Sequence, residues 1–133
     1  MPKSRFPVIM ALLLVACAHG KTDHFPAGAD PSNSAEVVVI RSDELFGWGF
    51  SLKVALDGTA IASLRSGDYI AFRVAPGFHT IGISEDNTLS LPLRQGQTYY
   101  LLISADYSAF GFELERIDEG KGRYWRNRTK PLE

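Results

Sequence analysis

LKVALDGTAIASL, residues 52–64, decides the fold class of this chain. Before Asp57-Gly58, apolar residues alternate with smaller or polar ones, which is the period of a β-strand with one buried face. The Asp-Gly pair is typical of a two-residue hairpin turn, because both of its residues tolerate a positive φ. Residues 59–64 then return as a second apolar run. The stretch therefore predicts an antiparallel β-hairpin.

Similar short runs recur on both sides of this hairpin. These runs are residues 37–41, 70–74, 78–84, 89–93, 98–105 and 110–117, and turn-forming residues separate them. Seven or eight short strands at this spacing favour a β-sandwich or a small barrel. Pro92 favours the sandwich, because proline removes a ladder hydrogen bond and is tolerated on an edge strand. We therefore expect an all-β fold, a single small antiparallel β-sandwich over residues 36–117, and no useful helical pattern outside the leader.

The core of this sandwich is expected from the apolar positions that share one face of each strand. They are Leu52, Leu56, Ile70, Phe72, Leu91, Leu101 and Ile103. Residues 98–105 are apolar on both faces, as in the central strand of a sheet.

The N-terminus reads as a secretory leader. Lys3 and Arg5 precede an apolar run from Phe6 to Ala16, which is too short for a membrane-spanning helix of roughly 20 residues. A positive start, a short apolar run and small residues at its end are the marks of a signal peptide. We assign residues 1–16 to it.

The leader ends in Leu14-Val15-Ala16-Cys17, which resembles the lipobox of bacterial lipoprotein precursors. That resemblance implies a diacylglycerol on the thiol of Cys17, cleavage before this residue and acylation of the new N-terminus. Two or three acyl chains would give lasting membrane anchorage, whereas one gives only reversible binding. A buried free thiol and an intermolecular disulfide are the alternatives for this single cysteine. The residue after the cysteine is Ala18 rather than Asp. By the same resemblance, this favours a location in the outer membrane, facing the periplasm.

Residues 17–35 read as the lipidated cysteine followed by a flexible linker, because the stretch is rich in Gly, Pro, Ser, Asp and Asn and shows no periodicity. His19 and His24 lie in it. Two isolated histidines without supporting carboxylates or thiols are more often solvated than metal-bound, and we expect no metal.

The order of the turn motifs in the domain resembles that of a known family. They are Leu56-Asp57-Gly58, Leu64-Arg65-Ser66-Gly67-Asp68-Tyr69, Ala75-Pro76-Gly77-Phe78-His79 and Gln95-Gly96-Gln97-Thr98-Tyr99-Tyr100. This series is similar to an uncharacterised domain of small bacterial lipoproteins and to PEGA-type and prealbumin-like sandwiches. The resemblance covers about residues 36–117 and implies an immunoglobulin-like or prealbumin-like fold, with no assigned activity.

The chain shows no nucleophile elbow, phosphate loop, paired-histidine zinc motif or calcium loop. Asp57-Gly58-Thr59 is explained by a hairpin turn, and Glu85-Asp86-Asn87 by a solvated acidic turn. His79, the one histidine inside the domain, is a candidate ligand or pH sensor. The alternative, which we favour, is a histidine at the rim of the sheet that hydrogen-bonds a neighbouring turn.

Two features remain as candidate contact sites. Residues 45–50 and 106–111 are turns that mix aromatic residues with glycine, and residues 118–133 form a basic and aromatic tail, either a short helix or an extended strap. Contact surfaces favour Trp, Tyr, Phe and Arg. We therefore expect a partner site at Trp48, Tyr107, Arg123 and Trp125; the alternatives are rings that plug the core and an ordinary solvated terminus.

The sequence as a whole predicts a non-enzymatic lipoprotein of the cell envelope that binds or scaffolds an envelope protein or a cell-wall polymer. A formal net charge of -1 gives no reason to expect nucleic acid, and no motif calls for a cofactor. The alternatives are a carrier of a small apolar ligand and an envelope enzyme with a site near His79.

Overall fold

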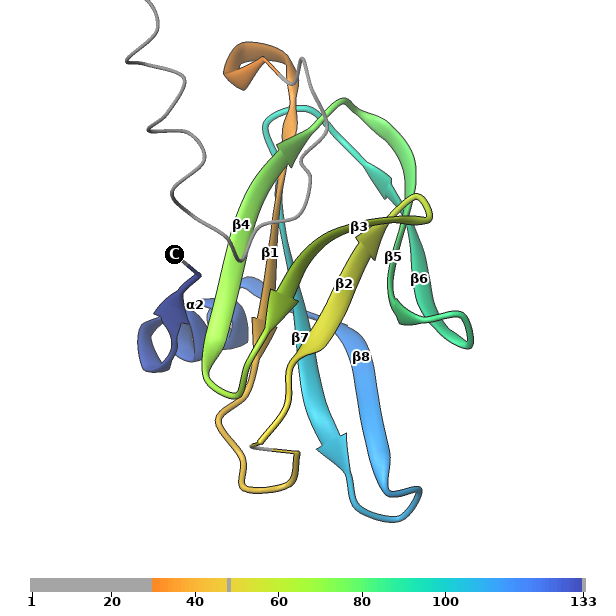
Figure 1. The fold of residues 1–133 in the computed structure, drawn as a ribbon. Coiled ribbons are helices and arrows are strands. Elements are labelled where there is room, and N and C mark those ends of the chain that lie inside the picture. The colour runs from red at the N-terminus through yellow and green to blue at the C-terminus, as the bar shows by residue number, and fades with distance from the viewer. Residues whose placement is uncertain (1–29, 48, 133) are drawn as a thin grey trace, which may run out of the picture.

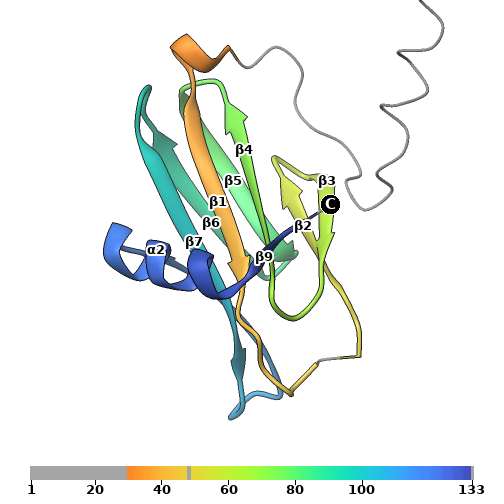
Figure 2. The same ribbon diagram turned by 90° about the vertical axis from the view of Figure 1, so that its left-hand side faces the viewer.

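The computed structural model describes residues 30–132 except Trp48, and their fold is the all-β sandwich that the sequence predicts. One sheet has the strand order β8-β7-β1-β4-β9 and the other β3-β2-β5-β6. Figures 1 and 2 show the two sheets as facing layers. The strands are β1 (Ala35–Arg41), β2 (Leu52–Leu56), β3 (Thr59–Leu64), β4 (Asp68–Val74), β5 (Gly77–Ser84), β6 (Asn87–Leu93), β7 (Thr98–Asp106), β8 (Gly111–Ile117) and β9 (Lys130–Pro131).

Two local predictions about the strands are confirmed. β2 and β3 form the predicted hairpin, and its turn residues Asp57 and Gly58 both have positive φ, at 50° and 85°. Pro92 lies on β6, the edge strand of the four-stranded sheet. Its missing N–H therefore costs the sheet no central ladder bond.

The core lies between the two sheets and contains the expected residues. Leu56, Ile70, Phe72, Leu101 and Ile103 are buried in it. Leu52 and Leu91 are only partly buried, although both pack against the same cluster. Leu52 begins its strand beside a loop and Leu91 lies on an edge strand, so neither is covered on all sides.

The sandwich is present as predicted, but one of its two sheets is not wholly antiparallel. β1 pairs in parallel with β7, and β4 pairs in parallel with the short β9, so the larger sheet is mixed. The alternation of apolar residues along a strand indicates which face of that strand is buried. It does not indicate whether the neighbouring strand runs parallel or antiparallel.

A helix, α2 (Glu119–Arg128), forms in the C-terminal tail, where the sequence left a short helix or an extended strap open and showed no helical pattern of useful length. Asp118 caps it by accepting the backbone N–H of Lys121 at 2.8 Å. Its two glycines and two adjacent aromatic residues are weak helix formers, which hides it from sequence patterns. Gly122 faces the ring of Tyr100 so closely that a Cβ at this position would overlap the ring. The helix thus depends on packing more than on propensity.

α2 lies on the outer face of the five-stranded sheet, away from β2 and β3 (Figure 2). Trp125 packs there, with Tyr69, against a second apolar cluster of Val38, Ile40, Tyr100, Leu102 and Ile117. This cover explains why β1 and β7 are apolar on both faces. Residues 98–105 are thereby confirmed as a central strand.

The end of the predicted linker belongs to the fold. Residues Pro31–Asn33 form a 3-10 turn capped by Asp30, and Ser34 is buried. The carbonyl oxygen of Ser34 accepts the N–H of Gly96 at 3.0 Å, which ties this segment to the β6–β7 turn. Within the described residues, no helix has the length and apolar character needed to cross a membrane.

Candidate functional site

The two aromatic turns lie at the same end of the sandwich. The β1–β2 loop, residues 42–51, and the turn between β7 and β8 are both at the bottom of Figure 1, opposite the end where residue 30 enters. We call this surface the aromatic end. It consists of Leu45, Phe46, Phe50, Tyr107, Phe110 and Phe112.

The rings of the aromatic end are in contact across the two loops. The ring centroid of Phe46 lies 5.7 Å from that of Tyr107 and 5.5 Å from that of Phe112. Phe50 meets Phe112 edge to face at 5.9 Å. These are the spacings of favourable aromatic pairs, so the two loops form one surface.

Arg41 holds the β1–β2 loop from beneath. Only 1% of this residue is exposed. Its Nη1 donates to the carbonyl oxygens of Phe50 and Leu64, both at 2.8 Å, and its Nη2 donates to that of Gly47 at 2.7 Å. The guanidinium also lies 5.0 Å from the centre of the Phe112 ring. Burial lowers the pKa of Arg41, an effect that nearby Asp68 and Glu44 oppose, and an arginine stays charged in proteins.

Glu44 joins the loop to the β7–β8 hairpin. Its carboxylate accepts the hydroxyl of Ser42 at 2.7 Å, the N–H of Ala105 at 2.8 Å and the hydroxyl of Tyr107 at 3.3 Å. Partial burial tends to raise the pKa of Glu44, but these three hydrogen bonds and the charge of Arg41 outweigh it and lower the pKa. Burial raises the pKa of Tyr107, and the charge of Glu44 and its hydrogen bond with the Tyr107 hydroxyl raise it further.

Several apolar side chains of the aromatic end nevertheless face solvent. Leu45 is 90% exposed, Phe110 81%, Tyr107 59% and Phe50 52%. Phe110 also has a φ of 52°, a conformation that non-glycine residues seldom adopt. Rigid, exposed apolar groups on neighbouring loops are typical of a contact surface.

The three candidate contact residues that the structure describes do not form one site. Tyr107 belongs to the aromatic end and is exposed as expected. Arg123 and Trp125 are on α2, against the outer face of the sheet, where Arg123 pairs with Glu119 at 2.6 Å and Trp125 is partly buried. Trp48 and the lipidation candidate Cys17 lie outside the described residues.

His79 is held by two turns, as the favoured interpretation predicts. Its Nδ1 lies 2.7 Å from Oδ2 of Asp57, in the β2–β3 turn, and its Nε2 lies 2.7 Å from the carbonyl oxygen of Ala75. Asp57 also accepts the N–H of Thr80 at 2.8 Å. Burial tends to raise the pKa of Asp57, but the bonds from Thr80 and His79 lower it overall. Both ring nitrogens of His79 are thus engaged, Nδ1 with the β2–β3 turn and Nε2 with the β4–β5 turn.

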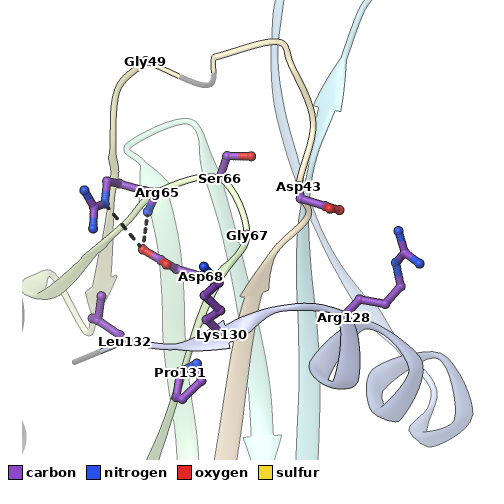
Figure 3. A pocket seen from close by; sticks show the side chains of 10 residues that line it. All are labelled: Asp43, Gly49, Arg65, Ser66, Gly67, Asp68, Arg128, Lys130, Pro131 and Leu132. Atoms are coloured by element: carbon purple, nitrogen blue, oxygen red, sulfur yellow. Dashed lines mark hydrogen bonds and ion pairs between the residues drawn. The ribbon is translucent and has the colours of Figure 1, made fainter.

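A cleft of about 690 Å³ lies beside the aromatic end, and Gly49 of the β1–β2 loop is part of its wall. Figure 3 shows its lining, which comes from this loop, the β3–β4 turn and the C-terminal segment. The charged residues of the lining are Asp43, Arg65, Asp68, Arg128 and Lys130. Asp68 accepts the backbone N–H of Arg65 at 2.9 Å and so also closes the β3–β4 turn.

Sequence patterns missed the residues that organise the aromatic end. Arg41 and Glu44 read as part of a polar stretch, Arg41-Ser42-Asp43-Glu44, between two apolar runs. The available signal for a buried arginine was the position of Arg41 at the end of a run whose other residues are mostly apolar. The cleft had no comparable signal, because its walls come from three distant segments.

Within residues 30–47 and 49–132, no group of three or more His, Cys, Asp or Glu side chains is placed to bind a metal ion. The chain matches no family model, and searches of curated proteins and of solved structures gave no significant match.

Proposed function

We propose that this chain is a bacterial envelope lipoprotein, anchored through Cys17, whose β-sandwich is a non-enzymatic binding module. Its binding surface is the aromatic end, and its partner is an envelope protein or a cell-wall polymer. Ala18 after the cysteine supports a location in the outer membrane, facing the periplasm. The observation that supports this function best is the pair of exposed aromatic loops fastened by Arg41 and Glu44.

The fastening matters because binding is costly when loops must first be ordered. Arg41 fixes the backbone of the β1–β2 loop at Gly47 and Phe50, and Glu44 fixes it to the hairpin. Leu45 and Phe110 are therefore presented to solvent at little further entropic cost. Aromatic anchors of this kind supply most of the free energy at many protein interfaces.

The two alternatives have less support. An enzyme with a base at His79 would have to release one of the two contacts that its ring nitrogens make. A carrier of an apolar ligand needs an apolar cavity, whereas the cleft beside the aromatic end is lined mainly by charged and small residues.

Site-specific photocrosslinking in intact cells tests the proposal. A photoreactive residue in place of Leu45 should give a discrete adduct, whereas one in place of Phe78 should not. Phe78 is a matched control, because it is 78% exposed and lies at the start of β5, at the other end of the sandwich. Adducts of the same identity from both positions would contradict the assignment.

A second substitution sharpens this experiment. Phe110→Asn, combined with the crosslinker at position 45, should reduce the adduct about tenfold or more, as expected for loss of an interface anchor. Asparagine tolerates the positive φ of this position, so the unfolding temperature should not change. A full adduct yield would show that the β7–β8 turn is not part of the surface.

A further inference from the structure

The described part of the chain separates its charges by segment. Residues 118–132 hold five basic and two acidic side chains, a net charge of +3. Residues 30–117 hold six basic and eleven acidic side chains, a net charge of -5. The C-terminal segment is therefore a positive region on an otherwise negative module.

Three exposed residues of α2 share one flank of the helix. Lys121, Tyr124 and Arg128 follow the spacing i, i+3 and i+7, which places them along the same side. The guanidinium of Arg128 lies 5.5 Å from the centre of the Tyr124 ring. Lys130 on β9 follows directly after the helix. We call Lys121, Tyr124, Arg128 and Lys130 the basic face.

The cations of the basic face are available to a ligand. Among the described residues, Lys121, Arg128 and Lys130 form no ion pair, whereas Arg123 pairs with Glu119. Arg126 is not part of this face; it stacks on Tyr69 at 5.2 Å and fastens the helix to the sheet. Exposed, unpaired cations keep their full attraction for an external anion.

The basic face continues into the cleft. Arg128 and Lys130 line it together with Arg65 from the β3–β4 turn (Figure 3). One of its two carboxylates, Asp68, accepts the backbone N–H of Arg65 and pairs with the guanidinium of the same residue at 4.0 Å. This leaves Arg128 and Lys130 as the cations of the lining that are unpaired within the described residues. A volume of about 690 Å³ is in the range of small-ligand sites, so the cleft has room for a phosphate-bearing headgroup.

We propose that the basic face and the cleft dock on the headgroups of an anionic phospholipid membrane. Lysine and arginine beside tyrosine and tryptophan are the residues that favour the membrane–water interface. An anionic membrane repels residues 30–117, which carry a net negative charge. The charge separation therefore favours the orientation in which the basic face meets the membrane. This goes beyond the proposed function, because the basic face and the aromatic end are different surfaces.

Vesicle co-sedimentation of the full chain tests the docking. The Cys17→Ser background removes any covalent lipid, and the leader is the same in every variant, so its contribution cancels. Vesicles of phosphatidylcholine with phosphatidylglycerol should bind the chain more tightly than phosphatidylcholine alone, and added salt should weaken that binding. Lys121→Gln with Arg128→Gln should weaken partitioning about thirtyfold, from two lost headgroup contacts.

The matched control is Lys53→Gln with Arg94→Gln, which removes the same charge from exposed positions on β2 and in the β6–β7 turn. It should change partitioning by roughly twofold or less, because charges beyond a Debye length are screened. Both double variants should keep the unfolding temperature of the parent, since all four side chains are exposed.

Three results would overturn the docking proposal: an equal loss in the control, an equal effect of Lys121→Gln with Arg128→Gln on pure phosphatidylcholine, or displacement from vesicles by glycerol phosphate at the same phosphate concentration. The last would identify a site for free phosphate esters. None of them bears on the photocrosslink from position 45, so the two proposals fail separately.

Discussion

A single buried arginine decides the conformation of the loop that we assign to partner binding. Arg41 ends a strand of buried aliphatic residues, and its side chain turns under the β1–β2 loop to reach three carbonyl oxygens. Left without a donor, a buried carbonyl such as that of Leu64 costs about 1 to 3 kcal/mol. The conformation of the loop therefore contributes to the free energy of folding, although much of the loop surface is exposed.

Glu44 should make the aromatic end sensitive to acid. Because its folded pKa lies below the ordinary value of 4.5, its contribution to stability is complete above that pH and is lost as the pH falls through the folded pKa. Glu44→Gln should lower the free energy of unfolding by about 1 kcal/mol at pH 7, as the charge-assisted bonds weaken. Chemical denaturation from pH 7 to pH 3 should show this difference shrinking below pH 4.5. A difference that persists at pH 3, or that Glu113→Gln on the exposed face of β8 reproduces, would contradict this role.

Gly47 and Gly49 provide a matched pair in one loop. Gly47 has a φ of 72°, and a Cβ there would overlap the Phe112 ring, whereas a Cβ at Gly49 meets nothing within 4 Å. Gly47→Ala should lower the free energy of unfolding by about 2 to 4 kcal/mol, from the left-handed conformation and the overlap together. Gly49→Ala should change it by less than about 0.5 kcal/mol. Equal effects in thermal unfolding would show that the loop is not held as described.

At the scale of elements, periodicity predicted nearly all of the strands but did not decide between a helix and an extended strap in the C-terminal tail. The hairpin of residues 52–64 and the edge position of Pro92 could be predicted, because they follow from local sterics and from the burial of one strand face. Both leave a pattern in a single sequence. The parallel pairing of β1 with β7 and the docking of α2 depend on contacts between distant segments. So does the aromatic end: both of its turns could be recognised, but their contact through Glu44 could not.

α2 provides the element-scale prediction. Gly122→Ala adds helix propensity, worth about 1 kcal/mol, yet a Cβ there overlaps the Tyr100 ring. We expect the overlap to prevail, so that stability falls by about 1 to 3 kcal/mol and amide exchange over residues 119–128 accelerates. Gly120→Ala is the control, because its Cβ meets only the Asp118 carboxylate, at 3.3 Å; it should leave stability unchanged or slightly raised. If Gly122→Ala is as stable as Gly120→Ala, the helix does not pack closely on β7.

On the scale of the whole molecule, the basic face and the aromatic end lie on different parts of the sandwich, and the cleft lies between them. α2 covers a side of the sandwich, and the aromatic end lies where β1 and β7 finish. β1 has seven residues, so the aromatic end is about 20 to 25 Å from the point where residue 30 enters the fold. A module lying with the basic face on a membrane would therefore keep its aromatic end free for a partner.

The proposed anchor is compatible with this geometry. Thirteen residues lead from Cys17 to Asp30, and a chain of that length reaches about 45 Å at most. That reach exceeds the length of the sandwich strands, so a lipid on Cys17 would permit the basic face to meet the headgroups. It would also hold the domain at a high local concentration near the membrane, where weak docking becomes effective.

Cys17 itself carries the last prediction. If the lipobox-like Leu14–Cys17 is processed, the mature chain begins at an acylated cysteine, and mass spectrometry of its N-terminal peptide should show the acyl mass. Cys17→Ser should leave an unprocessed precursor or a chain released from the membrane by high salt, because only the electrostatic docking of the basic face would then remain. Wild-type protein should resist that salt wash, since two or three acyl chains hold it independently of ionic strength. A wild-type N-terminus with an unmodified Cys17, or with residues before it, would show that the chain is not a lipoprotein, and the domain would have to reach any membrane through the basic face alone.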